Sequence, residues 1–576
     1  MATCPKATPS PCFGGCFDLQ TANRHCGKCG HACAFGESCV KGRCLGQEPP
    51  TPEKQPVEVP WEDSGQDGGT TDATIEKIAE RIPERVEESP MEQIPDASLE
   101  QLPEESIREQ REQVPEQIQE KIPEKKPVET WAISPGTGAT KGIEVDGSGN
   151  VFAVGYFSDS FISGTIRQKS KGLGDLFVVK LDAKGSVTHF LACGGTEQDL
   201  AVDLTLDGQG GVYVVGYFHG KIACGGKTLL PTGKDPKQRD LFVLKLDTQL
   251  RVVWAKSFGN AASSAETIQR IRTYYDTSKK KTLLYLLGTF SGTALFSPQI
   301  SRKAAGKTDT FLLQMDGGTG AVLALNTLGS FVRSTRGYGL ALDAKGMVYI
   351  TGAFNTILQA RDVKKPLTLK SSHGNINIFL IKYDPFQKAY IWGKSFGSIS
   401  ALHHEEGQSL VVNAKGEIYL TGFIKATNTF GSTALKIKSQ GIRDIFVAKL
   451  NASGSFVWAT SIRGSSQDKV SHLVYDANGN LYVLGSIGNT KLLSFEIGRK
   501  TPTIKGSHTI LAKLDAKGSI TSYSVYPKPL TTTRGGLAIG KWLYFGNQYL
   551  GSPNIAGKPL PLGQTTARIF IAKVKP

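Results

Sequence analysis

The sequence predicts an all-β protein built from repeated units, and three observations support this fold class. Two short apolar runs, of which VYVVGYF (212–218) and LFVLKLD (241–247) are clear copies, return seven times after about residue 130. Turns of the form Asp-x-x-Gly lie between apolar runs in most units. The last unit lacks one strand, which a segment before the first unit could supply. Self-similarity of this kind is typical of repeat architectures.

The first apolar run contains a glycine in every copy. Successive glycines are 61 to 72 residues apart. This period is longer than that of a usual four-stranded propeller blade, but it is the kind of period that such repeats show. We expect the variation in spacing to fall in loops. The copies occupy 152–157, 213–218, 285–290, 349–354, 419–424, 482–487 and 544–549, with the glycines Gly155, Gly216, Gly288, Gly352, Gly422, Gly485 and Gly546.

The second apolar run and two flanking segments complete four strands per unit. Alternation of apolar and polar residues in LAVDLTLD (200–207) predicts a strand before the first run, and RVVWAKSFG (251–259) predicts one after the second. One lysine per unit favours a structural role over catalysis, with the lysine paired to a carboxylate or extended along neighbouring strands. These lysines are Lys180, Lys245, Lys382, Lys449, Lys513 and Lys573, and Gln314 replaces the lysine in the third unit.

The turns between strands share one chemistry. Asp at the first position can accept hydrogen bonds from the turn backbone, and a later glycine can adopt a positive φ, so we expect type I turns with a bulge. Calcium binding is the alternative, but one carboxylate per turn offers too few oxygens for a dedicated site. The pattern stands at Asp146, Asp182, Asp207, Asp343, Asp476 and Asp515, each followed three residues later by glycine.

The seventh unit indicates how the chain closes. After ARIFIAKVKP (567–576) no fourth strand follows, but TWAIS (130–134) aligns with VWAKS of the second unit. We therefore expect Trp131 and Ile133 to lie in a strand that completes the last unit, an arrangement that hides both open strand edges. The sequence predicts a seven-bladed β-propeller of four-stranded blades over residues 130–576, closed by this N-terminal strand. A two-sheet sandwich is the structural alternative.

The units resemble the bacterial seven-bladed β-propeller (SBBP) repeat. Its pattern D-x-x-G-N-V-Y-V-T-G-x-F is visible at 146–157 and 476–487. The resemblance covers roughly residues 131–576. It implies the propeller fold and a surface or secreted setting, and it provides no catalytic motif.

The N-terminal segment is rich in cysteine. Residues 1–46 hold too few apolar residues for a core, and their even number of eight cysteines predicts a small module with four disulfides in an oxidising location. Zinc binding by Cys26 and Cys29 near Cys33, with His25 and His31 as further possible ligands, is the alternative, but it leaves the other cysteines unexplained. The predicted disulfide residues are Cys4, Cys12, Cys16, Cys26, Cys29, Cys33, Cys39 and Cys44.

The cysteine frame of this module resembles that of the stigma-specific protein family. The matching stretch runs from Cys12 to Cys44, contains Asp18 and Leu19, and ends with C-G-x-C-G-x2-C-x2-G-x2-C-x2-G-x-C. Similar modules are common in predicted surface proteins of myxobacteria. The resemblance implies an extracellular module and carries over no catalytic residue.

Residues 47–129 predict a disordered Pro/Glu-rich stalk. Prolines that are usually followed by an acidic residue, as in IPE (82–84) and VPE (114–116), limit helices to a few turns and favour extended chain. Residues 47–130 hold 23 acidic and 9 basic side chains, a net charge of −14, and self-repulsion extends the chain further. As an alternative role, this acidic stalk could lie against the repeat domain and compete with its ligand.

The repeat region is strongly basic. Residues 131–576 carry 53 basic and 27 acidic side chains, a net charge of +26. This charge favours anionic partners such as acidic surface glycan or lipopolysaccharide and permits nucleic acid without favouring it, although lysine is also an ordinary solvated residue on β-rich surfaces. No apolar stretch approaches 18 residues, so no transmembrane segment is expected, and the first residues lack a signal-peptide pattern. We expect an extracellular, cell-surface or periplasmic location.

Motifs that carry chemistry are scarce. The chain contains no nucleotide-binding loop, no G-x-S-x-G elbow and no H-E-x-x-H pattern, so no catalytic, cofactor or metal residue is predicted. Cys193 and Cys224 are expected to form a disulfide within a unit or between neighbouring units. One dense polar cluster, on the loop that enters the fifth unit, is a candidate binding loop; a metal is the alternative ligand, but adjacent side chains diverge. The loop residues are His403, His404, Glu405 and Glu406.

These observations predict a non-enzymatic, monomeric surface protein that presents a basic propeller on a stalk to an anionic glycan or to other proteins. Two alternatives remain. The first is a propeller enzyme, either a lyase or hydrolase acting on polysaccharide or a quinoprotein-like oxidoreductase, with its groups at the central opening; the second is an architectural spacer. Unrepeated charged side chains at that opening would favour an enzyme, because catalysis breaks the symmetry that a scaffold keeps.

Overall fold

The computed structural model describes two compact units of the chain, Met1–Gln117 and Ile118–Pro576. All regular elements among the described residues are β-strands, which confirms the predicted all-β class. The predicted boundaries at residues 46 and 129 stay predictions. The described residues are 10–12, 15–17, 37–40, 43–46 and 130–576, except 233–238, 261–265, 332, 361–362, 364, 373–375, 399–403, 432–434, 440–441, 465–466, 488–507, 528–534 and 562.

The first unit is described at two β-hairpins. These are β1 (Ser10–Cys12) with β2 (Gly15–Phe17), and β3 (Glu37–Val40) with β4 (Arg43–Gly46). Cys39 lies opposite Cys44 in the second hairpin, and Cys12 and Cys16 lie in the first. The four-disulfide module stays a prediction, because the remaining cysteines lie outside the described residues: Cys4, Cys26, Cys29 and Cys33.

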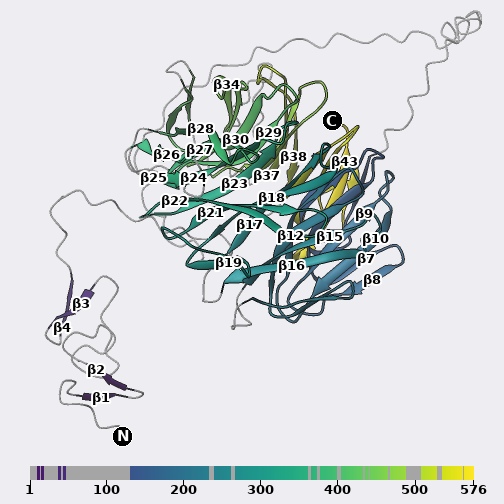
Figure 1. The fold of residues 1–576 in the computed structure, drawn as a ribbon. Helices are drawn as coiled ribbons and strands as arrows, with labels where there is room; N and C mark the ends of the chain where they lie inside the picture. The colour runs from purple at the N-terminus through teal and green to yellow at the C-terminus, as the bar shows by residue number, and fades with distance from the viewer. Residues whose placement is uncertain are drawn as a thin grey trace, which may run out of the picture. The chain divides into compact units, whose positions relative to one another are not determined.

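The second unit consists of four-stranded antiparallel sets (Figure 1). The second and third strands of each set are the two apolar runs that the sequence predicts. We name each set by its first strand. The first three sets are β6 (Gly136–Val145), β7 (Val151–Ser163), β9 (Asp175–Leu181) and β10 (Val187–Gly194); β11 (Leu200–Leu206), β12 (Val212–His219), β15 (Arg239–Leu246) and β16 (Val252–Asn260); and β17 (Thr267–Asp276), β18 (Lys281–Phe290), β21 (Asp309–Asp316) and β22 (Val322–Gly329). The next three are β23 (Thr335–Leu342), β24 (Val348–Asn355), β27 (Ile376–Asp384) and β28 (Ala389–Phe396); β29 (Glu406–Val412), β30 (Ile418–Ile424), β33 (Asp444–Leu450) and β34 (Phe456–Ile462); and β35 (Lys469–Tyr475), β36 (Leu481–Ile487), β37 (His508–Leu514) and β38 (Ile520–Pro527). The last set is β39 (Gly536–Ile539), β40 (Leu543–Gly551), β43 (Gly563–Val574) and β5 (Trp131–Ile133).

Adjacent sets contact each other through their first strands. Strand β6 contacts β11, and the contacts continue through β17, β23, β29 and β35 to β39. Strand β39 in turn contacts β6, so the sets form a closed circuit. The first and last sets accordingly lie side by side, with β43 next to the blue strands of the β6 set (Figure 1).

Strand β5 supplies the outer strand of the last set. It pairs antiparallel with β43, and Trp131 lies opposite Lys573. The same pairing joins Trp254 to Lys245 within the β11 set. The segment before the first set therefore occupies, in the last set, the position that the fourth strand occupies in the others.

The tryptophan of the outer strand binds the next set in the circuit. Trp131 donates from Nε1 to the carbonyl oxygen of Ala183, in a turn of the β6 set, at 3.2 Å. Gly185 of that turn has φ 90°, and a Cβ atom there would lie 2.6 Å from the Trp131 ring, so only glycine fits the conformation and the contact. Equivalent hydrogen bonds run from Trp254 to Gly317 at 3.2 Å and from Trp458 to Ala516 at 3.1 Å.

Short hairpins also join neighbouring sets. Each arises between the second and third strands of one set and pairs with the outer strand of the preceding set. The variable spacing of the repeat thus falls in segments that fasten one set to the next. The pairs are β13 (Ile222–Cys224) and β14 (Lys227–Leu229) on β10, β19 (Thr293–Ser297) and β20 (Ile300–Lys303) on β16, and β25 (Ile357–Ala360) and β26 (Leu367–Lys370) on β22.

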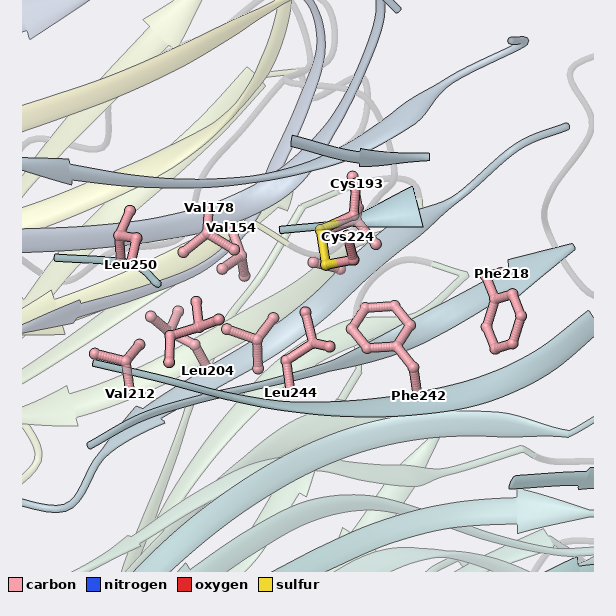
Figure 2. Packing of buried hydrophobic residues seen from close by; sticks show 14 of the residues in the cluster. Val154, Val178, Cys193, Leu204, Val212, Phe218, Cys224, Phe242, Leu244 and Leu250 are labelled. Carbon is pink, nitrogen blue, oxygen red and sulfur yellow. A yellow bond between two sulfur atoms is a disulfide. The ribbon is translucent and has the colours of Figure 1, made fainter. Parts of the chain in front are cut away.

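Apolar clusters fill the space between adjacent sets. Figure 2 shows one of them, in which Val154 and Val178 of the β6 set pack with Leu204 and Leu244 of the β11 set. All four side chains are fully buried or nearly so. Because each strand is covered on both faces by a neighbour, its apolar run is continuous in the second and third strands.

The recurring lysine lies over an aromatic ring on the adjacent strand. Lys245 lies opposite Tyr213 on the paired strand, and its Nζ atom is 5.5 Å from the centre of the Tyr213 ring. Lys449 makes the equivalent ring contact and also forms an ion pair with Glu417 at 2.9 Å. Gln314, which replaces the lysine in one set, donates to the hydroxyl of the corresponding tyrosine at 3.0 Å. These contacts support a structural role for the lysines, which stays a prediction.

The predicted Asp-x-x-Gly turns form as expected. In the first of them, Oδ1 of Asp146 accepts hydrogen bonds from the backbone N–H groups of Ser148 and Asn150, at 2.9 and 2.8 Å, and Gly149 has φ 82°. The carboxylate thus satisfies backbone donors of its own turn. This arrangement recurs at Asp182, Asp207, Asp343, Asp476 and Asp515.

One residue alignment made from the sequence is wrong. Gly155 lies opposite Phe177, and the glycines of the next four copies also lie opposite phenylalanine. In the last set the residue opposite Phe570 is Asn547, and Gly546 lies one position earlier. Asn547 occupies the position that glycine holds in the other copies, and Gly546 directly before it was aligned there instead.

Candidate functional site

The loop predicted to bind a ligand is described from His404 onward, and His403 lies outside the described residues. The Nε2 atom of His404 is 2.6 Å from Oε1 of Glu406, and Gln408 donates to the other oxygen of that carboxylate. Glu405 is fully buried. The acidic side chains of this loop are therefore held inside the protein.

The two adjacent carboxyl groups of this loop have opposite electrostatic environments. Burial raises the pKa of Glu405 to about 7. Burial also opposes ionisation of Glu406, but the hydrogen bond from His404 and the nearby charges of Arg443 and Arg336 lower its pKa overall. Among the described residues, no group of three or more His, Cys, Asp or Glu side chains is arranged to hold a metal ion.

The two cysteines of the repeat region form a disulfide. Cys193 in β10 of the first set bonds to Cys224 in β13, the hairpin of the next set, so the bridge joins neighbouring sets. Both residues are buried within the apolar cluster of Figure 2. The bridge reinforces the hairpin pairing and does not face a ligand.

The first strands carry charged residues that do not repeat between sets. Arg272 of β17 forms an ion pair with Asp203 of β11 at 2.9 Å, and burial raises the pKa of nearby Glu144 to about 7, with Arg272 opposing the rise. Arg270, which is 2% exposed, donates to the carbonyl oxygen of Ser471 in β35 at 3.4 Å. The side chain of Arg270 therefore joins sets that are three places apart in the circuit.

A pocket of about 740 Å³ lies between the β23 and β29 sets. One wall is the end of β28 with the following glycine, residues 394–397, and another is the end of the β25–β26 hairpin, residues 370–372. The β29 set contributes Thr429, Gly431 and the turn 454–456. This volume falls in the range of pockets that bind small molecules.

The described residues that line this pocket make it basic and include no carboxylate. Lys370 and Lys394 line it without any Asp or Glu, and neither lysine forms an ion pair with another described residue. The buried hydroxyl of Ser395 has no hydrogen-bond partner among the described residues. The rings of Phe396 and Phe456, whose centres are 5.1 Å apart, supply an apolar surface. The lining thus suits a ligand that combines negative charge, hydrogen-bonding groups and an apolar face.

One wall of the pocket is held by a hydrogen-bonded chain. Asn377, which is buried, donates from Nδ2 to the hydroxyl of Ser372 at 2.9 Å, and Ser372 donates to the carbonyl oxygen of Ser398 at 2.8 Å. Ser371 accepts a hydrogen bond from the backbone N–H of Thr356 at 3.0 Å. These contacts fix the backbone that follows Lys370 before any ligand arrives.

A second pocket, of about 420 Å³ between the β11 and β17 sets, has a mixed charge. Lys245 and Lys281 line it together with Asp207 and Asp316. Lys281 forms an ion pair with Asp316 at 2.5 Å, so part of the positive charge is already compensated. This pocket is less suited to an anion than the first.

Sequence reasoning missed the acid-free pocket. Lys370 lies in a hairpin whose length and sequence vary between sets, and Lys394 follows Trp392 by two residues as Lys256 follows Trp254, so it looks like part of the repeat. Only the approach of two sets shows that these lysines face the same space. In the described part of the chain, no helix has the length and apolar character needed to cross a membrane.

Comparison with known proteins assigns no family to this chain: no family model and no curated protein matches it. Solved structures with partial similarity include phage phi92 endosialidase, with 9% identity and a TM-score of 0.32 over 78% of this chain and 69% of that chain. A protein of unknown function from Dyadobacter fermentans has 10% identity and a TM-score of 0.34, over 65% and 93% of the two chains. A europium-containing methanol dehydrogenase has 10% identity and a TM-score of 0.27, over 62% and 84%. Similarity of this degree transfers no activity or ligand.

Proposed function

We propose that residues 130–576 form a seven-bladed β-propeller of the SBBP-repeat type that binds an anionic glycan without catalysing a reaction. The closed circuit of four-stranded sets supports the propeller, and so does the pairing of β5 with β43. The net charge of +26 over residues 131–576 supports an anionic ligand. The remainder of the proposal concerns where that ligand binds.

The acid-free pocket carries the proposal. Its two lysines can each donate a charge-assisted hydrogen bond to a carboxylate or sulfate, and Ser395 can donate to a sugar hydroxyl. The half-buried Phe456 can pack against the apolar face of a pyranose ring, supported from behind by the buried Phe396. An acidic sugar residue is the ligand class that uses all three features at once.

The proposed setting is extracellular, at a cell surface or in a periplasm. The disulfide between Cys193 and Cys224 is consistent with an oxidising compartment. Within this proposal, residues 1–46 form a stigma-specific-like cysteine module, and residues 47–129 form a stalk that separates it from the propeller.

The proposal is tested by calorimetric titration of the full chain with oligogalacturonate, a carboxylated oligosaccharide, and with a neutral dextran oligosaccharide of similar length. We expect binding of the acidic ligand only. Loss of two charge-assisted hydrogen bonds in a Lys370→Ala, Lys394→Ala variant should weaken binding by roughly 100-fold or more, since each is worth about 1.5–3 kcal/mol. Raised salt should weaken the wild-type interaction because the lysines are partly solvated.

The matched control also replaces two lysines by alanine, so its net charge equals that of the Lys370→Ala, Lys394→Ala variant, but it leaves the pocket intact. Lys436 and Lys438 are exposed on β32 (Lys436–Lys438) and do not line the pocket. If the Lys436→Ala, Lys438→Ala variant loses as much affinity as the pocket variant, the ligand is held by general charge and the pocket assignment is wrong. Equal binding of the neutral oligosaccharide would contradict the proposed ligand class.

A second candidate function, a propeller enzyme of the lyase or hydrolase type, is favoured by one observation. Burial raises the pKa of the unrepeated Glu144 to about 7, and Glu144 lies near the Asp203–Arg272 contact, so it could exchange a proton near neutral pH. The test is incubation with polygalacturonate and release of reducing ends. Activity that is lost in a Glu144→Gln variant would favour the enzyme, and no release from the wild-type chain would favour the binding module.

A further inference from the structure

Three exposed apolar side chains lie beside the same structural feature in alternate sets of the circuit. Leu173 and Ile442 precede the third strands β9 and β33, with exposures of 69% and 52%. Phe331, with 67% exposure, lies in the loop that leaves the β17 set. These exposures are far above those of the clusters between sets, so more than half of each side chain is accessible to solvent.

The common feature is a parallel β-bridge at the start of the third strand. Such bridges join Gly174 to Gln198, Thr308 to Ser334 and Arg443 to Gln467. Leu173 and Ile442 directly precede the first partner of their bridges, and Phe331 lies three residues before the second partner of its own. Because third strands of all sets begin at the same end of the circuit, the three apolar side chains lie at one end and at a similar level.

Cations accompany these apolar residues. Lys171 lies two residues before Leu173 and is exposed. The arginines nearby are half-buried: Arg333 follows Phe331 by two residues, and Arg443, directly after Ile442, lies over the Phe423 ring at 4.1 Å with the charges of Glu406 and Asp468 beside it. Lys307, next to the second bridge, is exposed. In the described parts of the bridge loops, Glu197 is the one exposed acid. This end of the unit therefore combines exposed apolar side chains with the exposed lysines Lys171 and Lys307.

We propose that this end of the second unit docks onto an anionic lipid surface. Residues from three separate sets cannot enter one narrow groove, but a bilayer offers a continuous apolar layer that all three can reach. The exposed side chains of Lys171 and Lys307 would then contact anionic headgroups. An acidic polysaccharide carries anionic groups that lysine can bind, but it offers no continuous apolar layer. Glycan binding in the pocket therefore does not account for the exposed Leu173, Phe331 and Ile442.

Sedimentation with vesicles tests the proposal on the full chain. Wild-type protein should sediment with vesicles that contain phosphatidylglycerol and phosphatidylcholine, and much less with phosphatidylcholine alone. A triple variant, Leu173→Ser, Phe331→Ser and Ile442→Ser, should bind at least 100-fold more weakly, since partial burial of each apolar side chain contributes roughly tenfold. Added salt should also reduce binding, because the headgroup contacts are screened.

The control variant removes three apolar side chains of similar exposure from the outer strands. Val253, Leu323 and Val457 are 50%, 43% and 51% exposed on β16, β22 and β34. Replacing these three by serine should leave vesicle binding unchanged. Equal loss in both variants, or no sedimentation of the wild-type chain with anionic vesicles, would overturn the proposal.

The outcome is independent of the proposed glycan binding. The triple variant leaves Lys370 and Lys394 in place and should keep its affinity for the acidic oligosaccharide. If vesicle binding is instead lost in the Lys370→Ala, Lys394→Ala variant and kept in the triple variant, the lipid headgroup occupies the pocket and the loop residues do not dock, which contradicts the inference.

Discussion

Replacement of Trp131 by alanine should destabilise the second unit at the junction of its first and last sets. The side chain is 8% exposed and packs against the turn that contains Gly185. Truncation of a buried tryptophan costs about 3–5 kcal/mol. The carbonyl oxygen of Ala183 keeps a hydrogen bond from Lys573 at 3.1 Å, so no extra cost for an unsatisfied acceptor is expected. Trp131→Phe keeps most of the packing and should cost only about 1–2 kcal/mol.

The assay is urea unfolding followed by fluorescence, together with hydrogen exchange of the backbone amides of β5 and β43. Trp458→Ala is the matched control, because Trp458 makes the equivalent hydrogen bond between two sets that the chain itself connects. We expect Trp131→Ala to release β5 and to expose those amides of 571–573 that pair with it, whereas Trp458→Ala should leave them protected. A free-energy change below about 1 kcal/mol, or unchanged exchange in β43, would show that β5 does not close the circuit.

Three further predictions concern single contacts described above. Replacing Cys193 and Cys224 by serine should lower stability by about 2–4 kcal/mol, and reduction of the wild-type chain should have the same effect; an unchanged unfolding midpoint would contradict this. In the folded state, burial raises the pKa of Glu405 from the ordinary value of 4.5 to about 7. Proton binding by Glu405 therefore stabilises the folded state fully below pH 4.5, and this contribution is lost as the pH rises through 7. Glu405→Gln should therefore be more stable than wild type at pH 8, by about 3 kcal/mol, and unfolding measured from pH 4 to 8 should show a flatter profile. Arg270→Met should lower stability by about 1–3 kcal/mol if its hydrogen bond to Ser471 joins distant sets, and thermal melts equal to wild type would exclude that role.

The strand pattern could be read from the sequence because each strand carries its own signal. A run such as 241–247 is apolar on both faces, and the turn residues at Asp146 and Gly149 form local hydrogen bonds that do not depend on distant parts of the chain. The pairing partner of Trp131 could be predicted because the repeat supplies a template for the missing strand. Lys245 was assigned a structural role for the same reason.

The pocket and the charged contacts of the first strands could not be predicted, since they depend on residues brought together from different sets. Lys370 and Lys394 are separated by a variable segment, and nothing in the sequence states that both face one space. Arg270 reaches a carbonyl group that is 201 residues away in the chain. The error at Gly546 has a different cause, because glycine beside the true position preserved the expected pattern while shifting it.

The pairing of β5 with β43 has a mechanical consequence. Among the described residues, a pulling force on the N-terminal side first loads the hydrogen bond from Thr130 to the carbonyl oxygen of Ala556. The bonds between residues 131–133 and 571–573 bear the load next. A strand of three residues offers little resistance by itself, so the indole ring wedged against Gly185 must carry much of the tension. Traction on this segment would open the circuit at its junction before any other set separates.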